Sequence, residues 1–184
     1  IHMAQRNKTL VATALIDLNG FKQINDSYGH EAGDEVLKVV AKRLQASVRE
    51  SDTVARLSGD EFVLVLVNQP SLRYTLRMIE RLRSALSRPV VFDSTEISSG
   101  ASIGVSVYPH DGTGAIELVR AADVAMYHAK ATQKNEACFF SSDMKSHTEA
   151  KKKREDSMRS ALDRHELFLL FQPRVDLHTG YINA

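Results

Sequence analysis

The chain has 184 residues, 43% of them hydrophobic, which is enough for one compact domain with a sizeable core and an appendage. Charged residues make up 26% of the chain and nearly cancel to a net charge of +1, so no overall field points to nucleic acid or to an anionic membrane as a partner. The single cysteine, Cys138, excludes an internal disulfide and fits a reducing compartment, so a cytoplasmic location is expected.

Two further classes of protein are disfavoured by the sequence. No apolar run approaches the ~20 residues that span a bilayer, so we expect no membrane contact by this segment. The seven histidines show no paired ligand spacing, which argues against a zinc site. The first three residues, Ile1-His2-Met3, resemble a vector-derived leader.

The first predicted element is a strand over residues 10–16, a nearly continuous apolar run that indicates burial on both faces. It ends at Asp17, for which two interpretations are open. Open α/β proteins often place chemistry at the end of a buried strand, and an aspartate also commonly caps the helix that follows. Helices are predicted next, over residues 21–28 and from about residue 33 to residue 49, because apolar residues recur there at helical spacing.

A β-hairpin is predicted after these helices. Two β-prone runs, residues 53–57 and 62–67, flank a Ser-Gly-Asp turn. Gly59 lets the backbone come close to a ligand, and the adjacent Asp60 and Glu61 can hold a hard cation. Taken alone, this turn has an ordinary alternative, because exposed acids are common turn residues.

The second half of the domain continues with helices and strands. A helix is predicted from Pro70 to about Leu86, and arginines such as Arg81 lie largely off its apolar stripe, as they do on a solvated face or at an anion site. The remaining predictions are a strand over residues 97–108, a helix over residues 116–132 and a short strand over residues 137–140.

The composition changes at residue 142. Residues 142–165 are predicted to form a mostly exposed connecting helix, and its basic run at 151–154 is interpreted as a solvated face in preference to a nucleic-acid contact. The apolar stretch 166–172 predicts a new strand without a following partner, and so the start of a second domain. The predicted domain boundaries are therefore 4–141, 142–165 and 166–184.

The order of elements predicts an α/β fold with a mixed central sheet flanked by helices. If the first strand and the hairpin are neighbours in that sheet, Asp17 lies beside Asp60 and Glu61. Three carboxylates at one sheet edge repel one another unless a cation joins them. Oxygen-only ligands favour Mg²⁺ or Mn²⁺, and such ions usually accompany a phosphate substrate.

Three lysines add to this predicted site. Lys22 can reach phosphate oxygens, and so can Lys130 and Lys134, which lie four residues apart and share a face if the helix extends that far. Each lysine alone is ordinarily a surface charge. Together with the carboxylates they predict a nucleoside triphosphate site that uses metal-assisted phosphoryl chemistry.

Four motifs in the same order and spacing resemble the GGDEF family of diguanylate cyclases. They are IDLNGFKQIND (16–26), Gly29-His30 with Gly33-Asp34, RLSGDEF (56–62) and ADVAMYHAK (122–130). The resemblance covers about Thr9 to Phe140 and implies a nucleotidyl-cyclase or polymerase-palm-like fold with its signature on a β-hairpin. The tail, ELFLLFQPRVDLHTG (166–180), is similar to the opening of an EAL-type cyclic di-GMP phosphodiesterase domain without its catalytic residues, which implies a GGDEF–EAL tandem parent.

The resemblance implies catalytic and metal-binding roles. Members of the family join two GTP molecules into cyclic di-GMP and release two pyrophosphates, and each protomer holds one GTP, so catalysis requires a homodimer. The metal positions match Asp17, the Leu18 carbonyl and Asp60. The catalytic positions match Asp60, Glu61 and Lys22. The metal lowers the pKa of the ribose 3′-hydroxyl and stabilises charge on the α-phosphate.

The same resemblance implies the nucleotide contacts. Asn25 and Asp34 match the guanine readers, and a carboxylate suits guanine because the N1–H and N2–H donors of this base are lacking in adenine. Besides Lys22, the remaining GTP-binding positions match Gly59, Lys130 and Lys134.

A product-binding site is implied by Arg49-Glu50-Ser51-Asp52, which matches the RxxD inhibitory site of the family. Cyclic di-GMP binds there and restrains the two domains, and Arg81 is expected to be a secondary contact. The alternative is an i,i+3 ion pair between Arg49 and Asp52 at a helix end.

Three departures from the family pattern bear on activity. Ser58 replaces the first glycine of the signature, and if that position needs a positive φ, serine costs about 1 kcal/mol or more and crowds the nucleotide. Asn19 stands where aspartate is frequent, and Gln133-Lys134 stands where Gly-Arg is frequent. A working diguanylate cyclase and a non-catalytic GTP-binding regulator of a phosphodiesterase domain both stay open. A cyclase that acts on one ATP is disfavoured by Asn25 and Asp34.

Overall fold

The structure is a computed structural model, and it describes residues 1–131, 136–144, 157, 160–161, 164, 166, 170, 174–175 and 182–183. The chain divides into two compact units, Ile1–Thr148 and Glu149–Ala184, which we describe separately. Among the residues named above, no helix is long and apolar enough to cross a bilayer.

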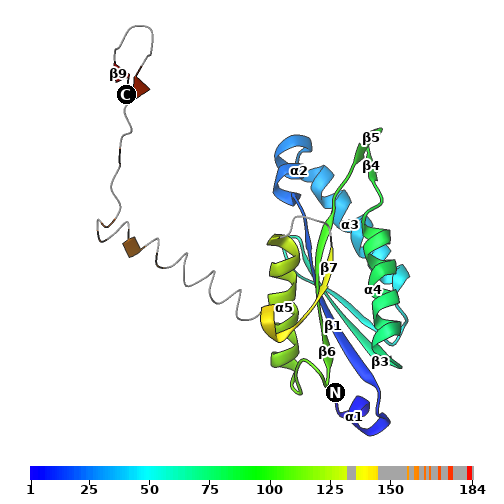
Figure 1. The fold of residues 1–184 in the computed structure, drawn as a ribbon. Helices are drawn as coiled ribbons and strands as arrows, with labels where there is room; N and C mark the ends of the chain where they lie inside the picture. The colour runs from blue at the N-terminus through cyan, green and yellow to red at the C-terminus, as the bar shows by residue number, and fades with distance from the viewer. Residues whose placement is uncertain are drawn as a thin grey trace. The chain divides into compact units, whose positions relative to one another are not determined.

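The first unit is a mixed sheet with helices on its two faces (Figure 1). Its sheet has the order β2-β3-β1-β6-β7, antiparallel throughout except that β6 and β7 run parallel. The predicted fold class is confirmed, and so is the pairing of the first strand with the hairpin. In chain order the elements are α1 (His2–Asn7), β1 (Leu10–Leu18), α2 (Phe21–Tyr28), α3 (His30–Ser47), β2 (Thr53–Ser58), β3 (Glu61–Gln69), α4 (Leu72–Leu86), β4 (Val90–Phe92), β5 (Thr95–Ile97), β6 (Ala101–Tyr108), α5 (Ala115–Ala131) and β7 (Ala137–Phe139).

The two faces of the sheet are each covered by helices, which explains why the first strand has almost no polar residues. Successive side chains of a strand point to opposite faces. Ile16 and Phe62 belong to the large core with α3 and α4, whereas Leu15 and Val63 pack with Met126 of α5. Figure 1 shows α5 on one side of the sheet and α3 and α4 on the other.

Helix α5 rests directly on the backbone of β6. A Cβ atom at Gly104 would lie 2.0 Å from the backbone nitrogen of Met126 and 2.1 Å from the carbonyl oxygen of Ala122. The Ser106 hydroxyl, also beneath this helix, donates a hydrogen bond of 2.7 Å to the carbonyl of Leu118. Small residues on the strand therefore determine how deeply α5 sits, and with it where the last turn of the helix lies.

Two predicted boundaries differ from the structure. Helix α3 begins at His30, earlier than predicted, because only Gly29, with a φ of 85°, separates it from α2. The predicted strand 97–108 is two strands, since β5 pairs back onto β4 in a separate hairpin and β6 begins at Ala101. Asp93 and Ser94 have φ angles of 45° and 63° in that turn, a geometry usually signalled by glycine. Because no glycine is present there, the sequence did not predict the hairpin.

The chain begins with a short helix that the sequence did not predict. Helix α1 spans His2–Asn7, and Ala4 is only 3% exposed. Ala4 packs in a small cluster with Val11, Tyr108 and Leu118. The sequence gives little sign of this helix because it buries a single alanine.

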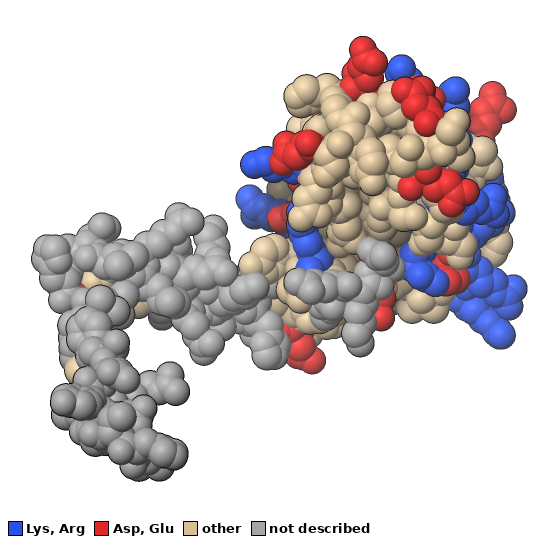
Figure 2. Space-filling view, turned by 90° about the horizontal axis from the view of Figure 1, so that it is seen from above, with Lys and Arg blue, Asp and Glu red and all other residues tan. Residues whose placement is uncertain are grey.

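Within the described residues of the second unit, β8 (Arg174–Val175) and β9 (Ile182–Asn183) form a short antiparallel pair. The predicted connecting helix over 142–165, its basic run at 151–154 and the strand over 166–172 lie largely outside the described residues. These predictions and the three predicted domain boundaries stay predictions. On the face of the first unit seen in Figure 2, basic and acidic side chains are interspersed, mostly toward the rim, and much of the middle is uncharged.

Candidate active site

A pocket of about 390 Å³ lies where β1 ends beside the β2–β3 turn, within the usual size range of ligand sites. Segments distant in sequence converge on it from the end of β1, the start of α2, the hairpin turn and the last turn of α5. Its lining residues are Asp17, Leu18, Asn19, Gly20, Phe21, Lys22, Asp60 and Lys130. The structure therefore brings together two of the predicted carboxylates and two of the predicted lysines.

The register of the sheet explains why Asp17 meets the hairpin turn. Asp17 lies opposite Glu61 in the β1–β3 pairing, and the Leu18 N–H donates a hydrogen bond of 3.3 Å to the Asp60 carbonyl. This adjacency confirms the expectation that the strand end and the signature turn are neighbours.

Glu61 does not join the other two carboxylates. It lines a different pocket, with Arg120 and Asp123 of α5, and its Oε2 atom accepts a hydrogen bond of 3.0 Å from the Ser58 hydroxyl. Within the described part of the chain, no three Asp, Glu, His or Cys side chains form a group that could hold a metal ion. The structure therefore does not bring Glu61 into one three-carboxylate group with Asp17 and Asp60, although Glu61 lies opposite Asp17 in the sheet.

Asp17 is the most constrained group of the pocket. Its side chain is 7% exposed, and Oδ2 accepts a hydrogen bond of 2.8 Å from the Lys130 ammonium. Its Oδ1 atom is buried and has no hydrogen-bond partner. Asp17 does not cap the following helix, whose N-cap is Gly20 without any side-chain cap. The capping interpretation of Asp17 was wrong, and a buried carboxylate with an unsatisfied oxygen remains to be explained.

Asp60 experiences the same negative field. Burial raises the pKa of its carboxyl above the ordinary value, and the charges of Asp17 and Glu61 add to the increase. A hydrogen bond from its own backbone N–H and the charge of Lys130 act in the opposite direction. Asp17 therefore repels the partly buried Asp60 carboxylate, and a divalent cation between two such acids relieves this repulsion.

The pocket passes a chemical test for such a cation. Its candidate donors are all hard oxygen atoms, namely the carboxylates of Asp17 and Asp60 and the carbonyl of Leu18. Mg²⁺ and Mn²⁺ prefer this type of donor. The unsatisfied Oδ1 atom of Asp17 supplies a coordination position that the chain itself does not use.

The two predicted guanine readers lie on adjacent helices. The Asn25 side chain packs over Gly33, where an added Cβ atom would lie 1.9 Å from its Oδ1 atom. Asp34, the next residue of α3, lines a separate pocket with Lys38 and Arg56. The missing side chain at position 33 therefore leaves the space that the Asn25 amide fills.

The predicted inhibitory site has a different local geometry from the proposed ion pair. The Asp52 carboxylate accepts hydrogen bonds of 3.0 Å from the backbone N–H groups of Arg49 and Val67, so the i,i+3 side-chain pair is not formed. The Arg49 guanidinium lies over the Tyr74 ring, 5.2 Å from its centroid, and hydrogen-bonds to its hydroxyl. Arg81 donates to the Ser47 carbonyl at the end of α3.

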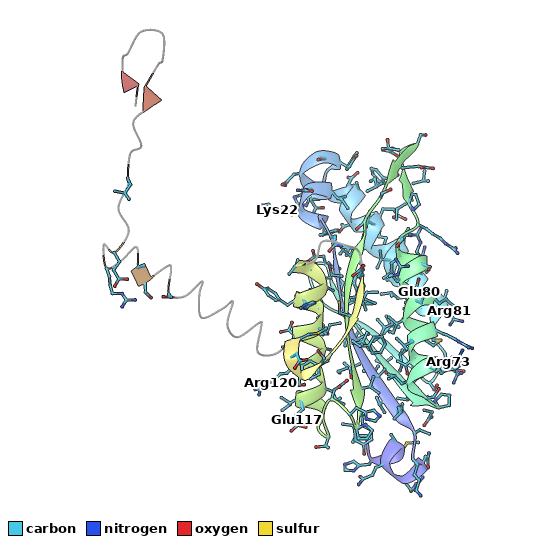
Figure 3. All side chains as sticks on the ribbon, viewed as in Figure 1. Lys22, Arg73, Glu80, Arg81, Glu117 and Arg120 are labelled. Carbon is cyan, nitrogen blue, oxygen red and sulfur yellow. The ribbon has the colours of Figure 1, made fainter. Side chains whose placement is uncertain are left out.

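The basic residues fall on different sides of the unit. Figure 3 shows Lys22 projecting from α2 and Arg81 projecting from α4, on the opposite side of the sheet from Arg120. Lys134 lies outside the described residues.

Sequence reasoning missed Tyr74 as the support of Arg49, and Arg120 and Asp123 as neighbours of Glu61, because these contacts join elements far apart in the chain.

Ser58 does not strain the signature turn. Gly59 carries the positive φ, 45°, and Ser58 is not among the residues with positive φ. The condition under which serine would cost stability is therefore not met. Arg56 Nε also donates a hydrogen bond of 2.8 Å to the Gly59 carbonyl. The side chains of Arg56 and Ser58 therefore both make hydrogen bonds within the hairpin.

A mixed sheet with an acidic pocket at the signature hairpin defines a domain of the nucleotidyl-cyclase or polymerase-palm-like fold. The sequence model of the family described as "Diguanylate cyclase, GGDEF domain" matches residues 1–136, and the chain belongs to this family. The resemblance seen in the sequence motifs is thereby confirmed.

Two proteins of Pseudomonas aeruginosa are similar in sequence to most of this chain. The bifunctional diguanylate cyclase/cyclic di-GMP phosphodiesterase MucR is 43% identical over 95% of this chain and 25% of its own length. The cyclic di-GMP phosphodiesterase NbdA is 37% identical over 94% of this chain and 22% of its own length. The solved GGDEF domain of TpbB, also called YfiN, matches with a TM-score of 0.78 and 33% identity, covering 80% of this chain and 87% of that one. The chain thus spans about a quarter of the length of these curated relatives.

Proposed function

We propose that this GGDEF domain is a diguanylate cyclase that condenses two GTP molecules into cyclic di-GMP and releases pyrophosphate. The observation that carries the proposal is the buried Asp17 carboxylate, with one unsatisfied oxygen, in the same pocket as Asp60, Lys22 and Lys130. Asp17, Asp60 and the Leu18 carbonyl would hold Mg²⁺ or Mn²⁺. The bound ion supplies acidification of a ribose hydroxyl and neutralisation of phosphate charge.

The other residues of the chain bind and orient the nucleotide in this proposal. Lys22 and Lys130 contact the phosphates, Asn25 and Asp34 read the guanine edge, and Gly59 lets the turn approach the nucleotide. One domain holds one GTP, so two domains have to meet face to face for the two nucleotides to react. Catalysis therefore needs a homodimer, and its rate should rise with protein concentration.

A second candidate function rests on Glu61. Because this carboxylate accepts a hydrogen bond from the Ser58 hydroxyl and lines a different pocket, the domain would in this case bind GTP without turning it over and so regulate a cyclic di-GMP phosphodiesterase domain. A relative named only as a phosphodiesterase agrees with this alternative. Incubation with GTP and Mg²⁺ up to high protein concentration, followed by product analysis, decides between the two. Cyclic di-GMP with pyrophosphate supports the cyclase, and GTP binding without pyrophosphate supports the regulator.

Ser58→Ala should raise the rate of GTP turnover by about two- to tenfold, because it removes a hydrogen bond worth about 0.5–1.5 kcal/mol that restrains Glu61. Pyrophosphate release measures the rate. Ser58→Thr keeps the hydroxyl and should leave the rate close to that of the parent protein. Equal rates for the alanine and threonine variants would show that the hydroxyl does not control Glu61.

Gly33→Ala should weaken GTP binding by about tenfold, because the new Cβ atom takes the space of the Asn25 amide and about 1.4 kcal/mol of hydrogen bonding to the base is lost. Only a side chain has to move, and alanine favours a helix interior over glycine by about 1 kcal/mol, so the fold should persist. Calorimetric titration with GTP measures the affinity, and thermal unfolding checks the fold. An unchanged affinity would remove Asn25 from the guanine site.

The inhibitory site is also part of this proposal, with Arg49, Asp52 and Arg81 as the contacts to cyclic di-GMP. Arg49→Ala should weaken cyclic di-GMP binding by about tenfold or more, since a charge-assisted hydrogen bond to phosphate contributes about 1.5–3 kcal/mol. Equilibrium binding of cyclic di-GMP measures the change. Arg73→Ala, at an exposed arginine of α4, is the matched control. Equal effects of the two substitutions would argue against this site.

A further inference from the structure

The ion pair between Lys130 and Asp17 differs from every other ion pair in the described part of the chain. Its partners are 113 residues apart and join the last turn of α5 to the end of β1. The other pairs, Lys38–Glu35, Arg83–Glu80 and Arg164–Glu166, link residues two or three positions apart, and their side chains are exposed except for the half-buried Arg83. The Asp17 pair therefore serves the pocket, where the others lie on the surface.

Lys130 compensates the buried charge of Asp17 only in part. The ammonium contacts Oδ2 at 2.8 Å and leaves Oδ1 buried and unsatisfied. Lys130 is the lysine that contacts Asp17, and Asp60 is a second acid that lines the same pocket. A lysine ammonium is a single charge, and a divalent cation would compensate both acids more completely.

The Lys130 side chain is itself 54% exposed and stands at the penultimate residue of its helix. Its flexible four-carbon stem allows the ammonium to leave Asp17 without moving the helix backbone. Lys22 lines the same pocket from α2, so an anion entering the pocket meets a second basic group. When a phosphate is present, the Lys130 ammonium therefore has another negative group to pair with after it leaves Asp17.

We propose that Lys130 is an exchangeable placeholder for the divalent cation: it pairs with the Asp17 carboxylate until a nucleotide binds and then moves to the phosphates. The proposal rests on the proposed function, since it deepens the account of the same pocket. Lys130 opposes cation binding in the absence of nucleotide. A nucleoside triphosphate draws Lys130 away, so cation and nucleotide each strengthen the binding of the other.

The test compares Mn²⁺ binding in the absence of nucleotide for three proteins: the parent, Lys130→Met and Lys22→Met. Both variants remove one positive charge from the same pocket, but only Lys130 contacts Asp17. We expect Lys130→Met to bind Mn²⁺ at least tenfold more tightly than the parent, and Lys22→Met to change the affinity less than threefold. A lysine that served only to contact phosphate would leave Mn²⁺ affinity unchanged in its absence.

A second arm repeats the binding with a GTP analogue whose α–β bridge is not cleavable. The parent should gain more Mn²⁺ affinity from the analogue than Lys130→Met does, because only the parent has a lysine to displace. If Lys130→Met is unstable without a cation, the rise in its melting temperature on adding Mn²⁺ should exceed that of the parent. Lys130→Met binding Mn²⁺ alone no more tightly than Lys22→Met would overturn the placeholder role. Absence of Mn²⁺ binding by all three proteins, with and without the analogue, would instead overturn the proposed function.

Discussion

Asp17→Asn should lower the rate of cyclic di-GMP formation at least about a hundredfold, because it removes the buried charge around which the pocket is built. The substitution conserves size and leaves Lys130, which is 54% exposed, free to turn to solvent. The protein should therefore stay folded. Chromatographic measurement of cyclic di-GMP from GTP and Mg²⁺, under conditions where the parent is active, gives the rate.

Asp26→Asn provides the control for this substitution. Asp26 is exposed on α2, which also carries Lys22, and it does not line the pocket, so the rate should change less than twofold. Thermal unfolding of both variants separates lost chemistry from lost structure. A folded Asp17→Asn protein with at least half of the parent rate would contradict the role assigned to this carboxylate.

Gly104→Ala should lower the free energy of unfolding by about 3 kcal/mol or more. Its Cβ atom would meet backbone atoms of Met126 and Ala122, and a helix backbone cannot move aside as a flexible side chain does. Helix α5 would have to lift from the sheet, which also shifts Lys130 away from Asp17. Urea unfolding followed by circular dichroism measures the loss.

Gly114→Ala is the matched control, since it lies just before α5 and its Cβ would make only ordinary contacts of 3.9 and 4.0 Å with Glu117. We expect it to change stability by less than about 0.5 kcal/mol. If the two glycine variants unfold at the same urea concentration, the close seat of α5 on β6 is not a stability determinant.

Most of the elements could be predicted from sequence, because their apolar residues repeat with the period of a helix or a strand. The run over 10–16, the helix over 21–28 and the hairpin around Gly59 all lie close to where they were expected. Helix α1 and the β4–β5 hairpin were not predicted. A helix that buries one alanine has no apolar stripe, and a turn built on Asp93 and Ser94 lacks the glycine that marks such turns.

The candidate site could also be predicted from sequence, since the acids and lysines stand within family motifs in a fixed order. That order did not predict which groups each side chain contacts. Asp17 was compatible with a helix cap, Arg49 and Asp52 with an ion pair, and Glu61 with a third metal-facing carboxylate. In the structure Asp17 pairs with Lys130, and the Arg49 guanidinium lies over a tyrosine ring. Asp52 accepts a hydrogen bond from a backbone amide, and Glu61 accepts one from Ser58.

By itself, the amino-acid sequence determined the fold class, the family and the set of residues available for chemistry, because these depend on short-range periodicity and on motifs. Only the tertiary structure decided that Lys130 lies on Asp17 and that one oxygen of Asp17 has no partner. That meeting of residues 113 positions apart depends on how deeply α5 sits on Gly104 and on the β1–β3 register. Both are properties of packed surfaces in three dimensions, which no linear pattern of residues encodes.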